Sequence, residues 1–223
     1  MGIELLHLLQ LTSPALPVGA FSYSEGLEVL VQRQQLTGVE PLAAWLQAEL
    51  RAGLVAVETA ALAPLSQALG AGDAAPVQEL DGWLLAQREA PELRAQQRQM
   101  GQALLLLLAD LGWPLPQPLA AAATGLAWPA AFAWAGVCLA IGAPQLQQAY
   151  LYGWVANQIS AAVRLVPLGA TDGQRLQVQL APLLAERGQQ LAQSDPQTLW
   201  SAGVGAGLAQ LQHAELYSRL FRS

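Results

Sequence analysis

Apolar residues recur at helical spacing along almost the whole chain, and glycines and prolines divide the pattern into short segments. No segment has the apolar–polar alternation typical of a half-buried strand. The pattern predicts helices over residues 4–11, 24–35, 41–62, 76–89, 91–111, 119–126, 129–141 and 144–164. Further helices are expected between 174 and 217, interrupted at Pro182 and Pro196. We therefore predict an all-α, bundle-like fold of about ten helices in a single domain, residues 1–223.

The amino-acid composition agrees with this fold class. The 223 residues include 44 Leu and 42 Ala against 13 Val, 3 Ile and 6 Thr, so helix-favouring residues far outnumber β-branched ones. Hydrophobic residues make up 53% of the chain, which is enough for a sizeable core. They also leave more apolar surface than one compact monomer hides, so a homodimer is expected.

The charged residues exclude several classes of function. All ten basic residues are Arg, and the chain has no Lys. A Walker A phosphate loop and a pyridoxal Schiff base both need a lysine, so neither class fits. The net charge of −6 also lacks the basic surface that nucleic-acid binding requires. Nucleic acid is therefore not an expected partner.

Candidate metal ligands are few and scattered. Cys138, His7 and His213 lie far apart in the sequence, and no two have the spacing of metal ligands. The glycine run at 203–207 does not form a GxGxxG pattern and follows no predicted strand, so no dinucleotide site is expected. A single cysteine allows no disulfide framework and suits a reducing compartment. The sequence therefore predicts no metal site and no cofactor.

A membrane association is the first alternative to a cytoplasmic protein. The start of the chain lacks the basic region of a signal peptide, because Glu4 stands there instead, so residues 4–11 are expected to be the first helix of a cytoplasmic protein. Residues 111–163 contain no Asp, Glu, Lys, Arg or His, and 119–143 is long enough to span a bilayer. Pro129 near its middle and the lack of flanking arginines argue against insertion. A helical membrane- or lipid-contacting protein nevertheless remains the alternative function.

An enzyme of unfamiliar type is the second alternative. Glu58 is the only charged residue between Arg51 and Asp73, so it would be the candidate carboxylate. Catalysis would need a convergent set of such groups, and an isolated Glu more often lies at the surface or in an ion pair. We therefore predict a protein that is not an enzyme.

One expected loop and one expected helix carry features that a purely structural role does not require. Residues 13–28 present Phe21 and Tyr23 on an expected loop, and Glu25 lies at the start of the helix predicted over 24–35. In the helix 91–111, Arg94 and Arg98 stand four residues apart and repel unless an acidic group faces them. Gly101 interrupts the same helix, which indicates that another helix approaches closely there.

The helix 144–164 has one face that mixes aromatic, amide and cationic groups. Tyr150, Trp154, Asn157 and Arg164 fall within about 80° of one another on a helical projection. Aromatic residues beside an arginine are typical of interaction hot spots. The opposite side is expected to face the core, and it holds Tyr152, Ala156, Ile159 and Val163.

The C-terminal tail, residues 218–223, is the last candidate for partner binding. Its apolar content is unusual for a disordered segment, and its arginines suit carboxylates on a partner. We expect the tail to be mobile in the free protein and to become ordered when a partner binds, with Phe221 in a pocket of that partner.

These stretches resemble those of one family when they are read together. SPALPVGAFSYSEGLE, RExxELRxQxxQMG, LYGWxxNQxxAAVRLVPLGxTDGQR and YSRLFRS occur in this order and resemble the UreF family of urease accessory proteins over residues 8–223. The resemblance implies an all-helical, non-enzymatic, cytoplasmic scaffold that forms homodimers. It also implies binding to UreD (also called UreH) and to the GTPase UreG. UreG would supply the phosphate loop that is absent from this chain. The assembly would deliver nickel to urease apoprotein.

The resemblance leaves open whether the scaffold regulates GTP hydrolysis or conducts nickel. Relatives commonly have Lys where Arg164 stands and Gln where Ala170 stands, so a role that needs an ammonium group is not carried over. The residues predicted to bind partners are Phe21, Tyr23, Glu25, Arg94, Arg98, Tyr150, Trp154, Asn157, Arg164, Tyr217, Arg219, Leu220, Phe221 and Arg222.

Overall fold

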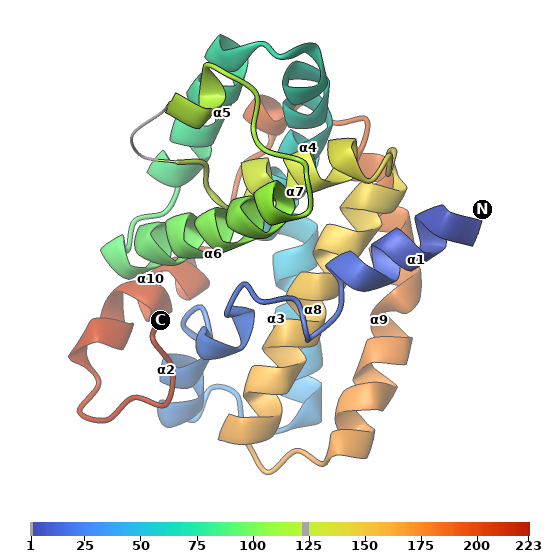
Figure 1. Ribbon diagram of the computed structural model, residues 1–223. Coiled ribbons are helices and arrows are strands. Elements are labelled where there is room, and N and C mark those ends of the chain that lie inside the picture. Colours follow the sequence, from blue (N-terminus) through green and yellow to red (C-terminus); the bar gives the residue numbers. More distant parts are fainter. Residues whose placement is uncertain (1, 122–124) are drawn as a thin grey trace.

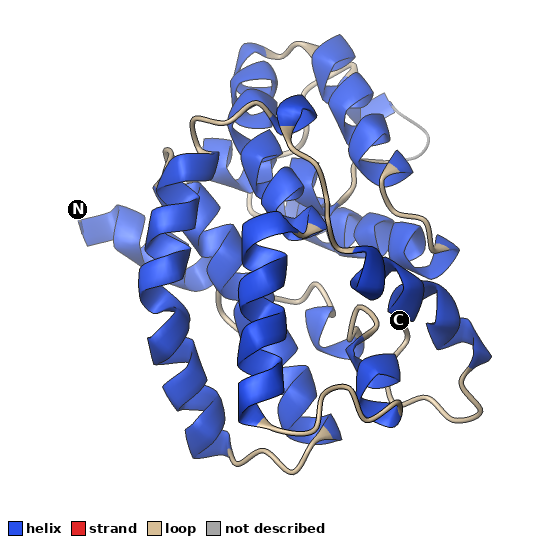
Figure 2. Ribbon diagram, turned by 180° about the vertical axis from the view of Figure 1, so that it is seen from behind, coloured by secondary structure: helices blue, strands red, loops and turns tan. Residues whose placement is uncertain are grey.

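The computed structural model describes residues 2–121 and 125–223, and these residues form helices joined by short turns, with no strand among them (Figures 1 and 2). The all-α prediction is confirmed. The helices are α1 Gly2–Leu11, α2 Leu27–Gln32, α3 Val39–Ala52, α4 Leu54–Ala71, α5 Ala74–Ala86, α6 Pro91–Asp110, α7 Trp128–Cys138, α8 Gln145–Leu165, α9 Ala170–Leu191 and α10 Val204–Gln212. Short 3-10 turns are η1 Ala20–Ser22, η2 Leu119–Ala121, η3 Pro196–Thr198 and η4 His213–Glu215.

Helix α4 is the central helix of the core. It packs against α3, α5, α7 and α8, and its first half, from Val55 to Leu62, is buried on every side. A helix surrounded by neighbours needs no polar face, which explains its apolar sequence. One charged residue, Glu58, is buried within it.

Helices α8 and α9 form an antiparallel pair at one side of the molecule (Figure 1). They approach closely at Gly188, where a Cβ would come within 3.1 Å of the Gln148 backbone nitrogen. The predicted break at Pro182 is wrong, because α9 continues through it. Leu180 and Leu184 are buried on either side of the exposed proline, so packing of the flanking turns outweighs the lost backbone hydrogen bond.

The helix predicted over 41–62 is divided into α3 and α4 at Gly53. The break is held by the chain after η3, since the Ala202 amide donates to the Ala52 carbonyl over 2.7 Å. The helix predicted over 119–126 also differs: the structure has only the turn η2, and residues 122–124 lie outside the described part.

One helical stretch of the described residues is long and apolar enough to cross a membrane. It runs from Val39 to Ala71, across α3 and α4, and 61% of its most apolar window is buried inside the fold. A core helix passes the same test of length and composition. The predicted candidate, 119–143, contributes α7 instead, whose Ala130, Phe132 and Ala135 are buried in the core.

The close approach predicted at Gly101 is confirmed, and it allows a matched pair of substitutions. A Cβ at Gly101 would overlap the Leu126 carbonyl oxygen and lie 2.7 Å from the Ala127 carbonyl carbon. We expect Gly101→Ala to lower the free energy of unfolding by about 1–3 kcal/mol, because backbone atoms must move. Gly82 lies exposed in α5 with nothing within 4 Å, so Gly82→Ala should raise it by about 0.5–1 kcal/mol. Urea denaturation measures the free energy of unfolding of both variants. An equal change in the two variants would contradict the close approach at Gly101.

Candidate functional site

The C-terminal segment lies along the loop that precedes α2, so that the red end of the chain lies beside a blue segment in Figure 1. The backbone oxygen of Ser223 accepts hydrogen bonds from the Ser24 hydroxyl at 2.7 Å and the Ser24 amide at 2.8 Å. The Arg222 amide donates to the Ser22 carbonyl at 2.9 Å. These contacts tie residues near the two ends of the chain into one unit.

Glu28 is the main anchor of this segment. Its carboxylate is buried and accepts from the Leu220 amide at 2.7 Å and from the Phe221 amide at 3.1 Å. The buried imidazole of His213 lies 3.1 Å from the same carboxylate. A carboxylate with several donors is well compensated for the loss of water, so Glu28 can hold the segment from inside the fold.

Phe221 fills a pocket of its own chain. It is buried, and the Arg164 guanidinium lies 4.5 Å above its ring in a cation–π contact. Arg164 also donates to the Phe21 carbonyl at 3.1 Å. The prediction of a mobile tail is therefore wrong, because Phe221 and the buried Ser223 gain within the molecule the contacts that were expected from a partner.

The packed segment leaves four side chains in solvent, while Phe221 points inward. Together with exposed neighbours they make a mixed cationic and apolar patch, which we call the terminal surface. Its members are Phe21, Arg164, Tyr217, Arg219, Leu220 and Arg222, and all of them are exposed. These six residues include three of the chain's ten arginines, although the net charge of the chain is −6.

A buried ionic network lies behind the loop. Arg88 donates through Nε to the Glu58 carboxylate at 3.0 Å, and the Tyr150 hydroxyl donates to the other Glu58 oxygen at 2.9 Å. Glu25 lies 3.8 Å from Arg88 and completes a cluster of two carboxylates around one guanidinium. Burial raises the pKa of Glu58, although Arg88 opposes this effect. Burial also raises the pKa of Tyr150 well above its usual value, with Glu58 adding to the rise.

Glu25 connects this network to the terminal surface. It has a positive φ of 52°, an unfavourable conformation for a residue other than glycine, so its surroundings must hold it there. Its carboxylate accepts from Gln96 at 2.8 Å and from the Trp154 indole at 3.1 Å. Gln96 in turn accepts from the Ser223 hydroxyl at 2.6 Å.

Glu49 lies near the same network on α3. Burial raises its pKa to about 7, and the nearby Glu25 carboxylate adds to the rise while Arg88 lowers it. Glycines at 53 and 203 leave room for its carboxylate, because Cβ atoms at either position would crowd it. Glu49 therefore exchanges its proton near neutral pH.

Of the two predicted arginines, Arg98 is partly buried and Arg94 is exposed, and both donate hydrogen bonds within the chain. Arg98 donates to Asp81 at 3.1 Å and also to the Gly125 carbonyl, so the acidic group expected to face it is present. Asp81 accepts from the Ala127 amide at 2.8 Å, which holds the chain at the start of α7. Burial raises the pKa of Asp81. Arg94 donates to the Glu89 carbonyl at 3.0 Å and caps the preceding turn.

On helix α8, some residues predicted to face a partner are buried, and some predicted to face the core are exposed. Tyr150 is buried beside Glu58, whereas Tyr152, expected in the core, is 43% exposed. Trp154 is half-buried, with its ring centroid 5.9 Å from that of Trp45, and Asn157 donates to the Tyr23 carbonyl at 3.3 Å. The helix is covered by the loop after α1 on the side that was expected to face a partner.

Two loop residues predicted to contact a partner are also buried. Tyr23 donates to Gln99 at 2.7 Å, and Glu25 belongs to the ionic network. Tyr23, Glu25 and Tyr150 therefore do not form part of the outer surface in this conformation. These side chains instead position the loop that carries Phe21.

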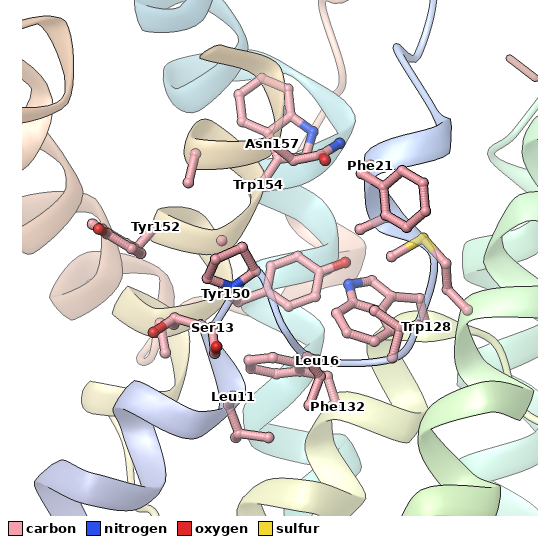
Figure 3. Close-up of a pocket in the computed structure, with 18 of the residues that line it drawn as sticks. Leu11, Ser13, Leu16, Phe21, Trp128, Phe132, Tyr150, Tyr152, Trp154 and Asn157 are labelled. Carbon is pink, nitrogen blue, oxygen red and sulfur yellow. The ribbon is translucent and has the colours of Figure 1, made fainter. Parts of the chain in front are cut away.

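A cavity of about 320 Å³ opens between this loop, α6, α7 and α8 (Figure 3). Tyr150, Phe132 and Trp128 converge on it, while Tyr152 points away. Glu25 and Glu58 form part of its wall. The rest of the lining is largely apolar and comes from residues between Leu11 and Phe21 and from α6 and α8.

The described residues contain no group of three or more His, Cys, Asp or Glu that could hold a metal ion. Burial raises the pKa of Cys138 to about 11, so its thiol remains protonated at neutral pH and is a poor metal ligand. His213 lies 3.1 Å from Glu28 and is fully buried.

Comparison with known proteins assigns the family. The UreF family model matches residues 36–181. The chain is 44% identical to the urease accessory protein UreF of Thermosynechococcus vestitus, over 98% of this chain and 97% of that one. It is 41% identical to the UreF of Alkalilimnicola ehrlichii, over 100% and 97% of the two chains. The chain belongs to the UreF family. The predicted resemblance is thereby confirmed.

The UreF family match spans α3 to the middle of α9, and the pairwise matches extend over both ends of the chain. Apart from Arg164, the residues of the terminal surface lie at those ends. Sequence reasoning missed Glu28, Arg88 and Gln96 as residues that position it. For Glu28 the available signal was a charged residue amid the apolar LEVLV run, which is unusual unless the charge is paired.

Proposed function

We propose that this UreF family member is a non-enzymatic scaffold of urease maturation. It binds UreD/UreH and the GTPase UreG, forms a homodimer, and takes part in delivering nickel to urease apoprotein in the cytoplasm. Membrane and nucleic acid are not among its proposed partners. The family membership supports the role in urease maturation, and the relatives are named as accessory proteins.

The observation that carries a scaffold role is the terminal surface. Tyr217 is fully exposed and Leu220 is 53% exposed, although each is next to residues held by the fold. Arg219 and Arg222 flank them and can pair bidentately with carboxylates. Because Glu28 already orders the backbone beneath, a partner binding here does not have to order the segment.

We assign the terminal surface to contacts with the accessory partners. We expect the tail to contact UreD/UreH, and the loop with Phe21 to contact UreG or the dimer seam. The tail and the loop with Phe21 belong to one surface. Separate pull-downs with UreD/UreH and with UreG measure which partner binds this surface.

The triple variant Tyr217→Ala/Arg219→Ala/Arg222→Ala tests the proposal. We expect urease activation in a co-expression assay to fall about tenfold or more, because aromatic and arginine anchors carry most interface energy. Its melting temperature should stay within about 2 °C of the parent, since all three side chains are exposed. Arg175→Ala is the matched control, because Arg175 is exposed and pairs only with Asp172. Unchanged activation with the triple variant would refute the assignment.

A further inference from the structure

Acidic residues form part of the wall of the cavity drawn in Figure 3. Glu25 and Glu58 are among its lining residues, and no Arg, Lys or His is. The guanidinium that pairs with them, Arg88, lies behind the carboxylates and outside the cavity wall. A molecule entering the cavity therefore meets carboxylates before it meets a cation.

The network behind this wall contains more acid than base. Two carboxylates, Glu25 and Glu58, surround the single guanidinium of Arg88, and all three are buried. Gln96 and Trp154 donate to Glu25, and Tyr150 donates to Glu58, but neutral donors do not cancel the excess negative charge, and burying such a charge is unfavourable. A cation in the cavity would compensate this charge without protonating Glu58.

The rest of the wall suits a cation that carries an apolar stem. Trp128 and Phe132 have ring centroids 5.4 Å apart, and Phe132 and Tyr150 meet edge to face at 5.2 Å. Aromatic rings attract organic cations through their quadrupoles. Leu16 and Met100 add aliphatic surface for a stem.

Another residue of the cavity wall has an unused hydrogen-bond acceptor. Gln97 lines the cavity and is buried, and its side-chain oxygen has no hydrogen-bond partner. A buried acceptor without a donor is costly, and an ammonium or guanidinium group carries several donors. Gln97 is thus a polar group that points to a ligand independently of the carboxylates.

We propose that this cavity is a binding site for an organic cation with an apolar stem, an alkylguanidinium or alkylammonium group. Such a group has two sources, a free small molecule or the side chain of an Arg or Lys on a protein partner. The second source rests on the scaffold function proposed above. The cationic head lies at Glu25, Glu58 and Gln97, and the stem lies against Trp128, Phe132 and Met100.

Titration of the purified full chain with n-butylguanidinium tests the site. We follow the indole resonances of Trp128 and Trp154 by NMR and measure affinity by calorimetry. The neutral isostere n-butylurea should bind about tenfold more weakly, and pentanoate should not bind. Gln97→Leu should weaken n-butylguanidinium binding about fivefold while the chain stays folded.

Met100→Trp provides a variant that fills the cavity, and it should abolish binding of the probe. Leu106→Trp is its matched control, because Leu106 is exposed on the same helix α6. No binding of n-butylguanidinium, equal binding of n-butylurea, or full binding to Met100→Trp would each overturn the proposal.

Urease activation by Met100→Trp then separates the two sources. If activation falls while the probe site is lost, the occupant is a partner's side chain. If activation is unchanged, the occupant is a free small molecule. Neither result depends on the terminal surface, so failure of the triple variant and failure of the probe titration are distinguishable.

Discussion

Replacing Arg88 by Met is expected to lower the free energy of unfolding by about 3–5 kcal/mol at pH 8. The substitution leaves the Glu58 and Glu25 carboxylates buried without their guanidinium. Glu58 can escape this penalty only by binding a proton, and burial already raises its pKa. The loss should therefore shrink as pH falls, because protonation of Glu58 removes the uncompensated charge. Chemical denaturation at pH 6 and pH 8 measures both effects.

Two variants serve as controls for Arg88→Met. The double variant Glu58→Gln/Arg88→Met should recover a large part of the loss, since it removes one carboxylate together with the cation. Arg175→Met should change stability by less than about 1 kcal/mol, because its pair with Asp172 is exposed. If Arg88→Met lowers the free energy of unfolding no more than Arg175→Met does, the buried ion pairs of Arg88 are not formed as described.

Phe221→Ala is expected to lower the free energy of unfolding by about 3 kcal/mol. The ring is buried and lies under the Arg164 guanidinium, so truncation leaves a cavity and ends the cation–π contact. Binding of the accessory partner should fall as well, because the backbone that presents Arg219 and Arg222 loses its anchor.

The adjacent residue provides the control for this prediction. Leu220→Ala should cost less than about 1 kcal/mol, because Leu220 is 53% exposed. Urea denaturation followed by circular dichroism compares the two variants. An unchanged free energy of unfolding for Phe221→Ala would instead support the mobile tail that the sequence predicted.

Most helices could be predicted because their boundaries depend on local signals. Pro91 begins α6, and the pattern that predicted residues 144–164 agrees with α8 to within one residue at each end. The break at Gly53 could not be found in this way, because it depends on contact with the distant Ala202. The continuation of α9 through Pro182 likewise depends on tertiary packing, which outweighed a strong local signal.

The sequence singled out some of the residues that the structure brings together, but not their geometry. Helical periodicity showed that Tyr150 and Trp154 share a face, but periodicity cannot distinguish a face covered by a loop from a face in solvent. Charge showed that Arg219 and Arg222 are unusual, but not that Phe221 between them points inward. That arrangement depends on Glu28, whose carboxylate accepts hydrogen bonds from the amides of Leu220 and Phe221. These residues follow Glu28 by 192 and 193 positions.

This separation along the chain has a consequence for folding. Closing a loop of that length in an unfolded chain costs on the order of 5 kcal/mol in entropy, before any contact compensates it. The helices between, such as α8 with α9, form from residues close in sequence and bring Glu28 toward the C-terminal segment as they pack. Docking of the segment is thus expected to come late in folding, after the surface that receives it has been assembled.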